Sequence, residues 1–333
     1  MLRRERRATL EDVAKEAGVS LATASRALGR SPLVRPDTVA RVHEAAERLR
    51  YLPGGAAQAL ASGRTMTVGA VVPTLDHAIF SRAIQAMQSR LAEDGYQLLL
   101  AAHNYDLEAE AKAVRAMLSR GVDALMLVGA DHVAETWELL ASTASPVALT
   151  WSFNSHFDSI GFDNVLAGRL AGQHLIARGH LTFGMISGYL ASNDRARMRV
   201  AGLRDALGAA GVELDQTRVI EEPFSLAGGR TGLARLLKGP KPPTAILCGN
   251  DLLAAGALFE AQSQGLKVPE DLAICGIDDL EIASHVSPTL TTVRLPTAAL
   301  GAQVAQHLLA RLAGQAVPRR VCLDIELIKR NST

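Results

Sequence analysis

Apolar side chains follow two different periods along most of this chain. From residue 65 onward, short continuous apolar runs alternate with longer stretches in which apolar side chains recur every three or four positions. A short apolar run is typical of a buried β-strand, and the wider spacing is typical of an amphipathic helix. Strands are predicted over 68–72, 97–101, 124–128, 147–150, 183–187, 219–221, 245–248 and 273–276. Helices are predicted over 81–93, 108–120, 165–178, 198–210 and 251–264.

This alternation predicts an α/β fold of parallel sheets flanked by helices, with ligands at the carboxyl ends of the strands. The predicted strands are too many for one short open sheet and suit two lobes. A polar turn over 155–161 interrupts the alternation and marks the expected lobe boundary.

The segment before residue 50 has helical spacing only. Thr9 is placed to cap one helix, Gly18 to end it, and Ser20 to cap a second helix over 21–28. A third helix is predicted from Pro36, a residue suited to a first helical turn. Three helices with a glycine-containing turn predict a helix-turn-helix unit whose second helix enters a DNA major groove. A generic three-helix bundle with a solvated basic face fits the same spacing.

Charge separates this head from the rest of the chain. The first 62 residues carry eleven Lys and Arg against seven Asp and Glu, a net charge of +4, whereas the whole chain carries +1 and the remainder therefore −3. A basic head on a mildly acidic body indicates that the head contacts a polyanion.

The chain has no sequence signal for export or membrane insertion. Residues 1–7 are basic like the start of a signal peptide, but charged residues follow within 9–18, and no apolar run reaches the ~18 residues of a membrane span. The three cysteines, Cys248, Cys275 and Cys322, are too widely spaced for a disulfide framework or a metal clasp. We expect reduced core cysteines in a cytoplasmic protein, with no metal and no cofactor.

The literal sequence of the head resembles the lactose-repressor (LacI/GalR) family of bacterial transcription regulators. The matching residues keep fixed spacings: Thr9-Leu10, Asp12-Val13-Ala14, Ala17-Gly18-Val19-Ser20, Thr23, Ser25-Arg26, Tyr51, Pro53, Ala57 and Leu60. The resemblance implies that the second helix reads bases with Leu21, Ala22 and Arg26. Arg26 has the chemistry for a bidentate contact with guanine, whereas Leu21 and Ala22 offer apolar contact to a thymine methyl. Phosphate or other DNA contacts are implied for Thr9, Ser20, Thr23, Ser25, Tyr51 and Ala57.

The stretch YLPGGAAQALASGRT, residues 51–65, combines a linker-like start with an alanine-rich helical middle. The resemblance implies a hinge that forms a short helix on specific DNA, with Leu60 as the wedge that enters the minor groove. The family's usual Pro-Asn opening is Pro53-Gly54 here, followed by Gly55. Glycine at these positions lowers helix stability by up to about 1 kcal/mol, so the helix depends more strongly on DNA.

The resemblance also implies that the body is similar to periplasmic sugar-binding proteins, with a ligand between the lobes and a C-terminal helix over 296–312 that returns to the first lobe. The positions matching ligand-binding residues are Ile79, Phe80, Trp151, Asp163, Asn193, Arg195, Arg197, Phe224, Asn250 and Asp278. Arg199 is expected to have a structural role at a helix start. The implied domains are 1–52 (head), 53–64 (hinge) and 65–333 (core), with lobe 1 over 65–160 and 293–320 and lobe 2 over 161–292 and 321–333.

Other interpretations of these residues stay open on sequence alone. Ile79, Phe80 and Trp151 also suit a local core, and polar residues after strands, such as Asn250 and Asp278, are common helix caps. Three arginines within 195–199 often form a solvated surface, whereas guanidinium groups also grip a carboxylate or vicinal hydroxyls. The gluconate-type repressors of the family share the GFDN stretch, and with these arginines it favours a sugar-acid effector.

Two other protein classes fit the sequence less well. An enzyme needs a nucleophile with a base, a metal cluster or a phosphate loop, and the Gly-rich LAGGRTG lacks the P-loop ending. A periplasmic-type sugar-binding protein fits the body but has no use for the basic head. The sequence therefore predicts a non-enzymatic repressor, a homodimer that binds a pseudo-palindromic double-stranded operator and a small sugar or sugar-acid effector.

Overall fold

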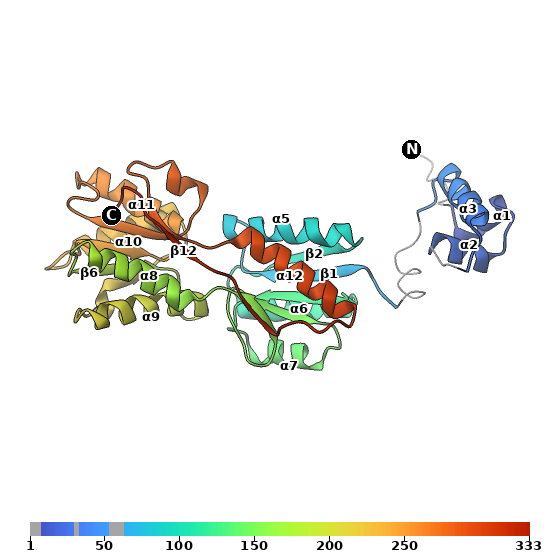
Figure 1. The fold of residues 1–333 in the computed structure, drawn as a ribbon, viewed down its shortest axis with the longest axis horizontal. Coiled ribbons are helices and arrows are strands. Elements are labelled where there is room, and N and C mark those ends of the chain that lie inside the picture. The colour runs from blue at the N-terminus through green and yellow to red at the C-terminus, as the bar shows by residue number, and fades with distance from the viewer. Residues whose placement is uncertain (1–7, 30–32, 53–62) are drawn as a thin grey trace. The chain divides into compact units, whose positions relative to one another are not determined.

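The computed structural model describes residues 8–29, 33–52 and 63–333. The chain divides into two compact units, Met1–Met66 and Thr67–Thr333, each described separately below (Figure 1). The predicted hinge residues Ala57 and Leu60 lie outside the described residues.

The described residues of the first unit form three helices, α1 (Leu10–Glu16), α2 (Leu21–Leu28) and α3 (Pro36–Arg48). Thr9 caps α1 through a reciprocal pair of hydrogen bonds, because its hydroxyl accepts from the Asp12 amide at 3.3 Å and the Asp12 carboxylate accepts from the Thr9 amide at 2.8 Å. Gly18 has a positive φ of 65° in the turn, and Ser20 caps α2. These starts and stops match the sequence prediction, since each rests on a local capping signal.

A small core holds the three head helices together. Val13 of α1, Ala24 and Ala27 of α2, and Val42 of α3 are fully buried, and Tyr51 packs partly against them. The exposed side chains of α2, those of Leu21, Ala22, Ser25 and Arg26, therefore lie on the face turned away from this core.

The second unit contains two six-stranded sheets. The first has the order β11-β5-β4-β3-β1-β2, and the second has the order β12-β10-β9-β8-β6-β7. Every strand pair is parallel except β10 with β12. The first sheet comprises β1 (Thr67–Val72), β2 (Gln97–Ala102), β3 (Ala124–Val128), β4 (Val147–Thr150), β5 (Asp158–Gly161) and β11 (Arg320–Cys322). The second comprises β6 (Phe183–Ser187), β7 (Val219–Glu221), β8 (Ala245–Cys248), β9 (Ala273–Asp278), β10 (Thr291–Arg294) and β12 (Glu326–Ile328).

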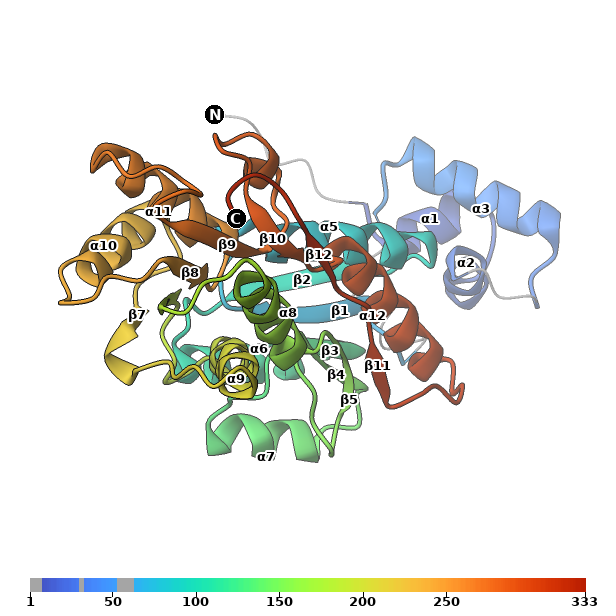
Figure 2. The same cartoon turned by 60° about the vertical axis from the view of Figure 1, so that its left-hand side comes forward.

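Helices cover both sheets, and each sheet with its helices is called a lobe here. Lobe 1 carries α5 (Ala78–Glu93), α6 (Leu107–Ser119), α7 (Ala134–Ser142) and α12 (Thr297–Leu312). Lobe 2 carries α8 (Asn164–Ala177), α9 (Asp194–Ala209), α10 (Leu226–Leu237) and α11 (Asp251–Ser263), with the short turns η1 (Gln216–Arg218) and η2 (Glu281–Ser284). Figures 1 and 2 show α12, coloured red, returning to lobe 1 beside α5. This α/β architecture with two mostly parallel sheets confirms the predicted fold class.

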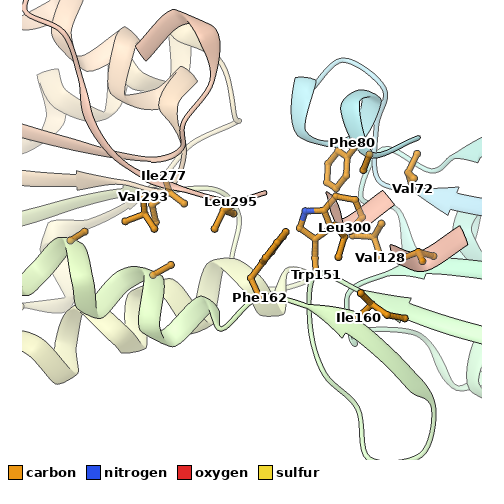
Figure 3. Close-up of a cluster of buried hydrophobic side chains, with 14 of the residues drawn as sticks. Val72, Phe80, Val128, Trp151, Ile160, Phe162, Ile277, Val293, Leu295 and Leu300 are labelled. Carbon is orange, nitrogen blue, oxygen red and sulfur yellow. The ribbon is translucent and has the colours of Figure 1, made fainter. Parts of the chain in front are cut away.

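The eight predicted strands are present, but four further strands were missed. β5 lies within the segment expected to be a polar turn. The other three, β10, β11 and β12, contain no long run of apolar residues. The chain crosses between lobes after β5, after β10 and between β11 and β12. Figure 3 shows Phe162 and Leu295, one from each of the first two crossings, packed between the apolar side chains of the two lobes.

Helices α8 and α9 pack closely because glycines lie at their crossing. A Cβ at Gly168 would lie 2.1 Å from the Arg199 carbonyl oxygen, and a Cβ at Gly202 would lie 1.9 Å from the Val165 carbonyl oxygen. Only glycine permits this backbone approach. The contact fixes α9 against α8 and so places its N-terminus at the carboxyl edge of the second sheet.

The expectation that all three cysteines belong to the core is wrong for one of them. Cys248 and Cys275 are buried on central strands, whereas Cys322 is exposed. Its strand, β11, forms the edge of the first sheet, so only one side of the strand has a neighbour. Among the described residues, no helix is long and apolar enough to cross a membrane.

Candidate functional site

A cavity lies between the two lobes and brings together eight of the ten predicted ligand-binding residues. These eight are Ile79, Phe80, Trp151, Asn193, Arg195, Phe224, Asn250 and Asp278. The remaining lining residues are His77, Tyr105, Ala196 and Arg199. The cavity volume is about 20 Å³, which is room for a single water molecule. The lobes are therefore closed against each other in this structure.

A second cavity of about 180 Å³ adjoins the first. It shares His77, Tyr105, Asn193 and Phe224 with the inner cavity and adds Thr74, Asn104, Tyr189, Glu222 and Pro223. Both lobes contribute to this outer cavity, so its walls also separate if the lobes part.

The parallel topology explains why these side chains meet. In lobe 1, Phe80 follows β1, Tyr105 follows β2 and Trp151 follows β4. In lobe 2, α9 begins after β6, Phe224 follows β7, Asn250 follows β8 and Asp278 ends β9. Because the carboxyl ends of parallel strands lie at one edge of a sheet, residues far apart in sequence converge there.

Asp278 is the most unusual polar group in the inner cavity. The residue is 4% exposed, and neither carboxylate oxygen has a hydrogen-bond partner among the described residues. The nearest cation is Arg199, whose Nη2 lies 3.9 Å from Oδ1. Burial raises the pKa of Asp278 to about 7, although Arg199 and Arg82 oppose the shift. Buried carboxylates normally accept hydrogen bonds, so this arrangement is complementary to hydroxyl or amine donors.

The Arg199 guanidinium is buried but partly satisfied by protein groups. Its Nε donates to Asn164 Oδ1 at 3.0 Å and its Nη1 donates to the Gly249 carbonyl oxygen at 2.6 Å. Burial lowers its pKa, against the field of Asp278. These bonds fit the structural role expected for Arg199. The Arg199 side chain also lines the cavity, close to Asp278.

Asn193 and Asn250 each line the cavity and cap a helix. The Oδ1 atom of Asn193 accepts from the Ala196 amide at 3.3 Å, and that of Asn250 accepts from the Leu253 amide at 2.9 Å. The cap interpretation and the position in the cavity therefore hold together for both residues.

Aromatic rings form the opposite wall. The Phe80 and Trp151 ring centroids lie 5.2 Å apart, and across the lobes His77 meets Phe224 edge-on at 5.7 Å. The Trp151 Nε1 donor is buried without a partner among the described residues. Burial lowers the pKa of His77 and raises that of Tyr105, so both side chains are neutral near pH 7. Such an aromatic wall suits the apolar face of a ligand ring, and the Trp151 Nε1–H group is available to donate a hydrogen bond to that ligand.

Two predicted ligand residues lie outside the cavity. Asp163 is exposed and caps α8 by accepting from the Leu166 amide at 2.8 Å. Arg197 is also exposed and bonds to Asp131 and to the Leu190 carbonyl oxygen. For Arg197 the reason is helix phase: α9 begins at Asp194 and not near residue 198, so side chains two positions apart in it face different sides.

His77, Tyr105 and Ala196 were missed in the sequence. His77 lies in the same PTLDHAIF loop as Ile79 and Phe80, and Tyr105 closely follows the predicted second strand. The rule that places ligands at strand ends could have found both.

In the head, the second helix presents a face that suits DNA. Ser20, Leu21, Ala22, Ser25 and Arg26 are exposed, with Leu21 at 46%, whereas Ala24 and Ala27 are buried. Thr23 is half-buried, and its amide donates to the Ser20 hydroxyl at 3.1 Å. The hydroxyl of Thr9 is engaged in its capping box, and Tyr51 packs on the head core.

Together, these features define a two-lobed ligand-binding core joined in one chain to a helix-turn-helix head. A family model described as bacterial regulatory proteins, lacI family, matches residues 9–54, and one described as a periplasmic binding protein-like domain matches residues 173–333. The chain belongs to the lacI family of bacterial regulatory proteins, which are DNA-binding transcription regulators and not binding proteins without a DNA role.

Individual relatives resemble nearly the whole chain. It is 33% identical over 331 residues to the HTH-type transcriptional repressor PurR of Haemophilus influenzae, covering 98% of both chains. It is 34% identical to the HTH-type transcriptional regulator GntR of Pseudomonas aeruginosa, covering 98% of this chain and 96% of that protein. A crystal structure of the lac repressor dimer bound to operator and the anti-inducer ONPF superposes with a TM-score of 0.88 at 29% identity, covering 98% of this chain and 99% of that one.

Proposed function

We propose that this chain is a homodimeric repressor in the cytoplasm whose operator affinity is set by a small sugar or sugar acid bound between its lobes. We divide it into a head over 1–52, a hinge over 53–64 and an effector-binding core over 65–333. The observation that carries the effector proposal is Asp278, a buried carboxylate without hydrogen-bond donors in the wall of the interlobe cavity. The lac repressor, which was solved as a dimer on its operator, supports the DNA half of the proposal.

The cavity chemistry favours a polyhydroxylated ligand. Hydroxyl groups would donate to the two oxygens of Asp278 and accept from the Trp151 indole, while the apolar face of the ligand lies on Phe80 and Phe224. The Arg195 guanidinium lines the same cavity and is suited to a ligand carboxylate. We therefore place a sugar acid first among effector classes.

The exposed face of α2 supplies the proposed operator contacts. Arg26 would bind a guanine through two hydrogen bonds, and Leu21 with Ala22 would contact a thymine methyl. Thr9, Ser20, Thr23, Ser25 and Tyr51 would serve the phosphate backbone, which sets register and not base choice. Ala57 and Leu60 would act in the hinge, where Leu60 wedges a base step.

Ligand in the cavity would favour one arrangement of the lobes, and that arrangement would set the spacing of the two heads in a dimer. The effector would bind one lobe arrangement more tightly than the other. The ratio of these two affinities limits how far the effector can change operator affinity.

A two-stage experiment tests the proposal. A thermal-shift screen of sugars and sugar acids first identifies ligands that stabilise the full-length protein. Operator duplexes selected from a random pool are then titrated by fluorescence anisotropy with and without each hit. We expect at least one hit to change operator affinity in the wild type, and to need a higher concentration for the same change in Asp278→Asn. Asp163→Asn is the matched control, because Asp163 lies outside the cavity. Tight operator binding that no cavity ligand alters would contradict the proposal.

A further inference from the structure

The N-terminus of α9 in lobe 2 is bonded directly to the loop that follows β3 in lobe 1. The Asp194 carboxylate accepts from the Ala130 amide at 3.1 Å through Oδ2. Three residues further on, Arg197 Nη2 donates to Asp131 Oδ1 at 2.6 Å. Asp194 is 4% exposed, whereas the Arg197 side chain is exposed, so the first contact is buried and the second lies at the rim.

Asp194 also holds a residue of the cavity wall. Its Oδ1 accepts from Arg195 Nη1 at 2.7 Å, and Arg195 is 7% exposed. The guanidinium lies against Gly129 of lobe 1, where a Cβ would be only 2.0 Å from Nη1 and where φ is +89°. One carboxylate therefore joins the backbone of lobe 1 to an arginine that lines the inner cavity.

The loop in lobe 1 is itself firmly anchored. His132 Nδ1 lies 2.6 Å from Glu110 Oε1, His103 Nε2 lies 3.5 Å from Glu110 Oε2, and all three side chains are almost fully buried. The His132 ring also meets Trp137 edge-on at 4.8 Å. Because these contacts lie within lobe 1, residues 129–131 move with that lobe as one body.

We propose that Asp194 and Arg197 are positioning residues that latch the closed lobes, and that Asp194 couples this closure to the placement of Arg195 in the cavity. The proposal rests on the proposed function in treating that cavity as the effector site. When the lobes part, Asp194 loses the Ala130 amide and meets water, which screens its pull on Arg195. Arg195 is then free to turn away from the position in the cavity wall that it holds in the closed structure.

The latch is tested without any effector or operator, by hydrogen exchange of the full-length protein with mass-spectrometric readout at Ala130. Asp194→Asn replaces a charged acceptor by a neutral one, and we expect exchange at Ala130 to rise about tenfold. Arg197→Ala removes the rim pair, and we expect a rise of about twofold to fivefold. Arg197→Lys should recover part of the protection, and the charge-exchanged double variant Asp131→Arg/Arg197→Asp should recover more than either single change.

Arg169→Ala is the matched control. Arg169 of α8 pairs at 3.1 Å with Asp205, which lies on α9 as Asp194 and Arg197 do, so this ion pair is entirely within lobe 2. The control variant should leave Ala130 unchanged, and exchange over residues 198–209 should stay at the wild-type level in Asp194→Asn. Unchanged exchange at Ala130 in Asp194→Asn, an equal rise in Arg169→Ala, or an equal rise along all of α9 would overturn the latch. A failed effector screen would overturn the proposed function alone, since this exchange measurement uses no ligand.

Discussion

The two lobes contribute different chemistry to the same cavity. Lobe 1 supplies mostly apolar and aromatic surface from Ile79, Phe80 and Trp151, whereas lobe 2 supplies the charged and amide groups Asn193, Arg195, Arg199, Asn250 and Asp278. The polar groups belong to helix starts and a strand end that are fixed by caps and glycine contacts within lobe 2. Under the proposed function, the polar groups of lobe 2 would select the ligand, and lobe 1 would cover the bound ligand and exclude water.

We expect the largest effect on ligand binding from removing the carboxylate charge of Asp278 in lobe 2. Asp278→Asn removes a charged acceptor of two hydrogen bonds, so we expect effector affinity to fall about 10- to 100-fold. Isothermal titration with the strongest ligand of the sugar and sugar-acid panel measures this loss. Operator affinity in the absence of effector should stay at the wild-type level, and retained effector affinity would show that lobe 2 does not recognise the ligand through Asp278.

The second effect is a pH dependence with a defined sign. The pKa of Asp278 is about 7 because of burial, and hydroxyl donors favour its ionised form. Binding therefore lowers this pKa and releases a proton below pH 7, so effector affinity rises with pH. We expect about tenfold weaker affinity at pH 6 than at pH 8, with a plateau above the pKa. Titration across this range should show the slope in the wild type and a flat profile in Asp278→Asn.

A smaller effect is expected from the covering surface of lobe 1. Ile79→Ala removes apolar area from the cavity wall at a half-buried position, and we expect effector affinity to fall about threefold to fivefold. Ile79→Val should lie between alanine and wild type. If Ile79→Ala weakens the ligand as much as Asp278→Asn does, the division of roles between the lobes is wrong.

The smallest effect is expected at Asp163, which sequence alone placed with the ligand residues. Asp163→Asn keeps the cap of α8 and lies outside the cavity, so effector affinity should change by less than about twofold. A change of tenfold or more in effector affinity in the same titration would show that Asp163 does contribute to ligand binding.

Most of the fold could be predicted because its signals are local. Thr9, Gly18 and Ser20 are capping and turn residues, and each of the eight predicted strands is a short apolar run. β5, β10, β11 and β12 carry no such signal, since their sequences DSIG, TTVR, RVC and ELI include charged or hydroxyl side chains and no long apolar run. Their pairing depends on partners far away in sequence, which no local pattern encodes.

The candidate site was predictable to the extent that strand ends determine it. Asn250 lies just after an apolar strand and Asp278 at the end of one, so their place at the cavity follows from parallel topology. Arg195 and Arg197 could not be separated in this way, because the side that each faces depends on the residue at which α9 begins. The missing donors of Asp278 and the contact between Asp194 and Ala130 are properties of three-dimensional packing alone.

In the proposed function, a ligand held by Asp278 between the lobes controls operator binding. The most direct test titrates a selected operator duplex with full-length protein, with and without a ligand from the sugar and sugar-acid panel, in the wild type and in Asp278→Asn. At a ligand concentration about tenfold above the wild-type Kd, we expect operator affinity to change by about fivefold or more in the wild type and by much less in Asp278→Asn. An equal ligand effect in both proteins, or none in the wild type, would show that Asp278 does not hold a ligand that controls operator binding.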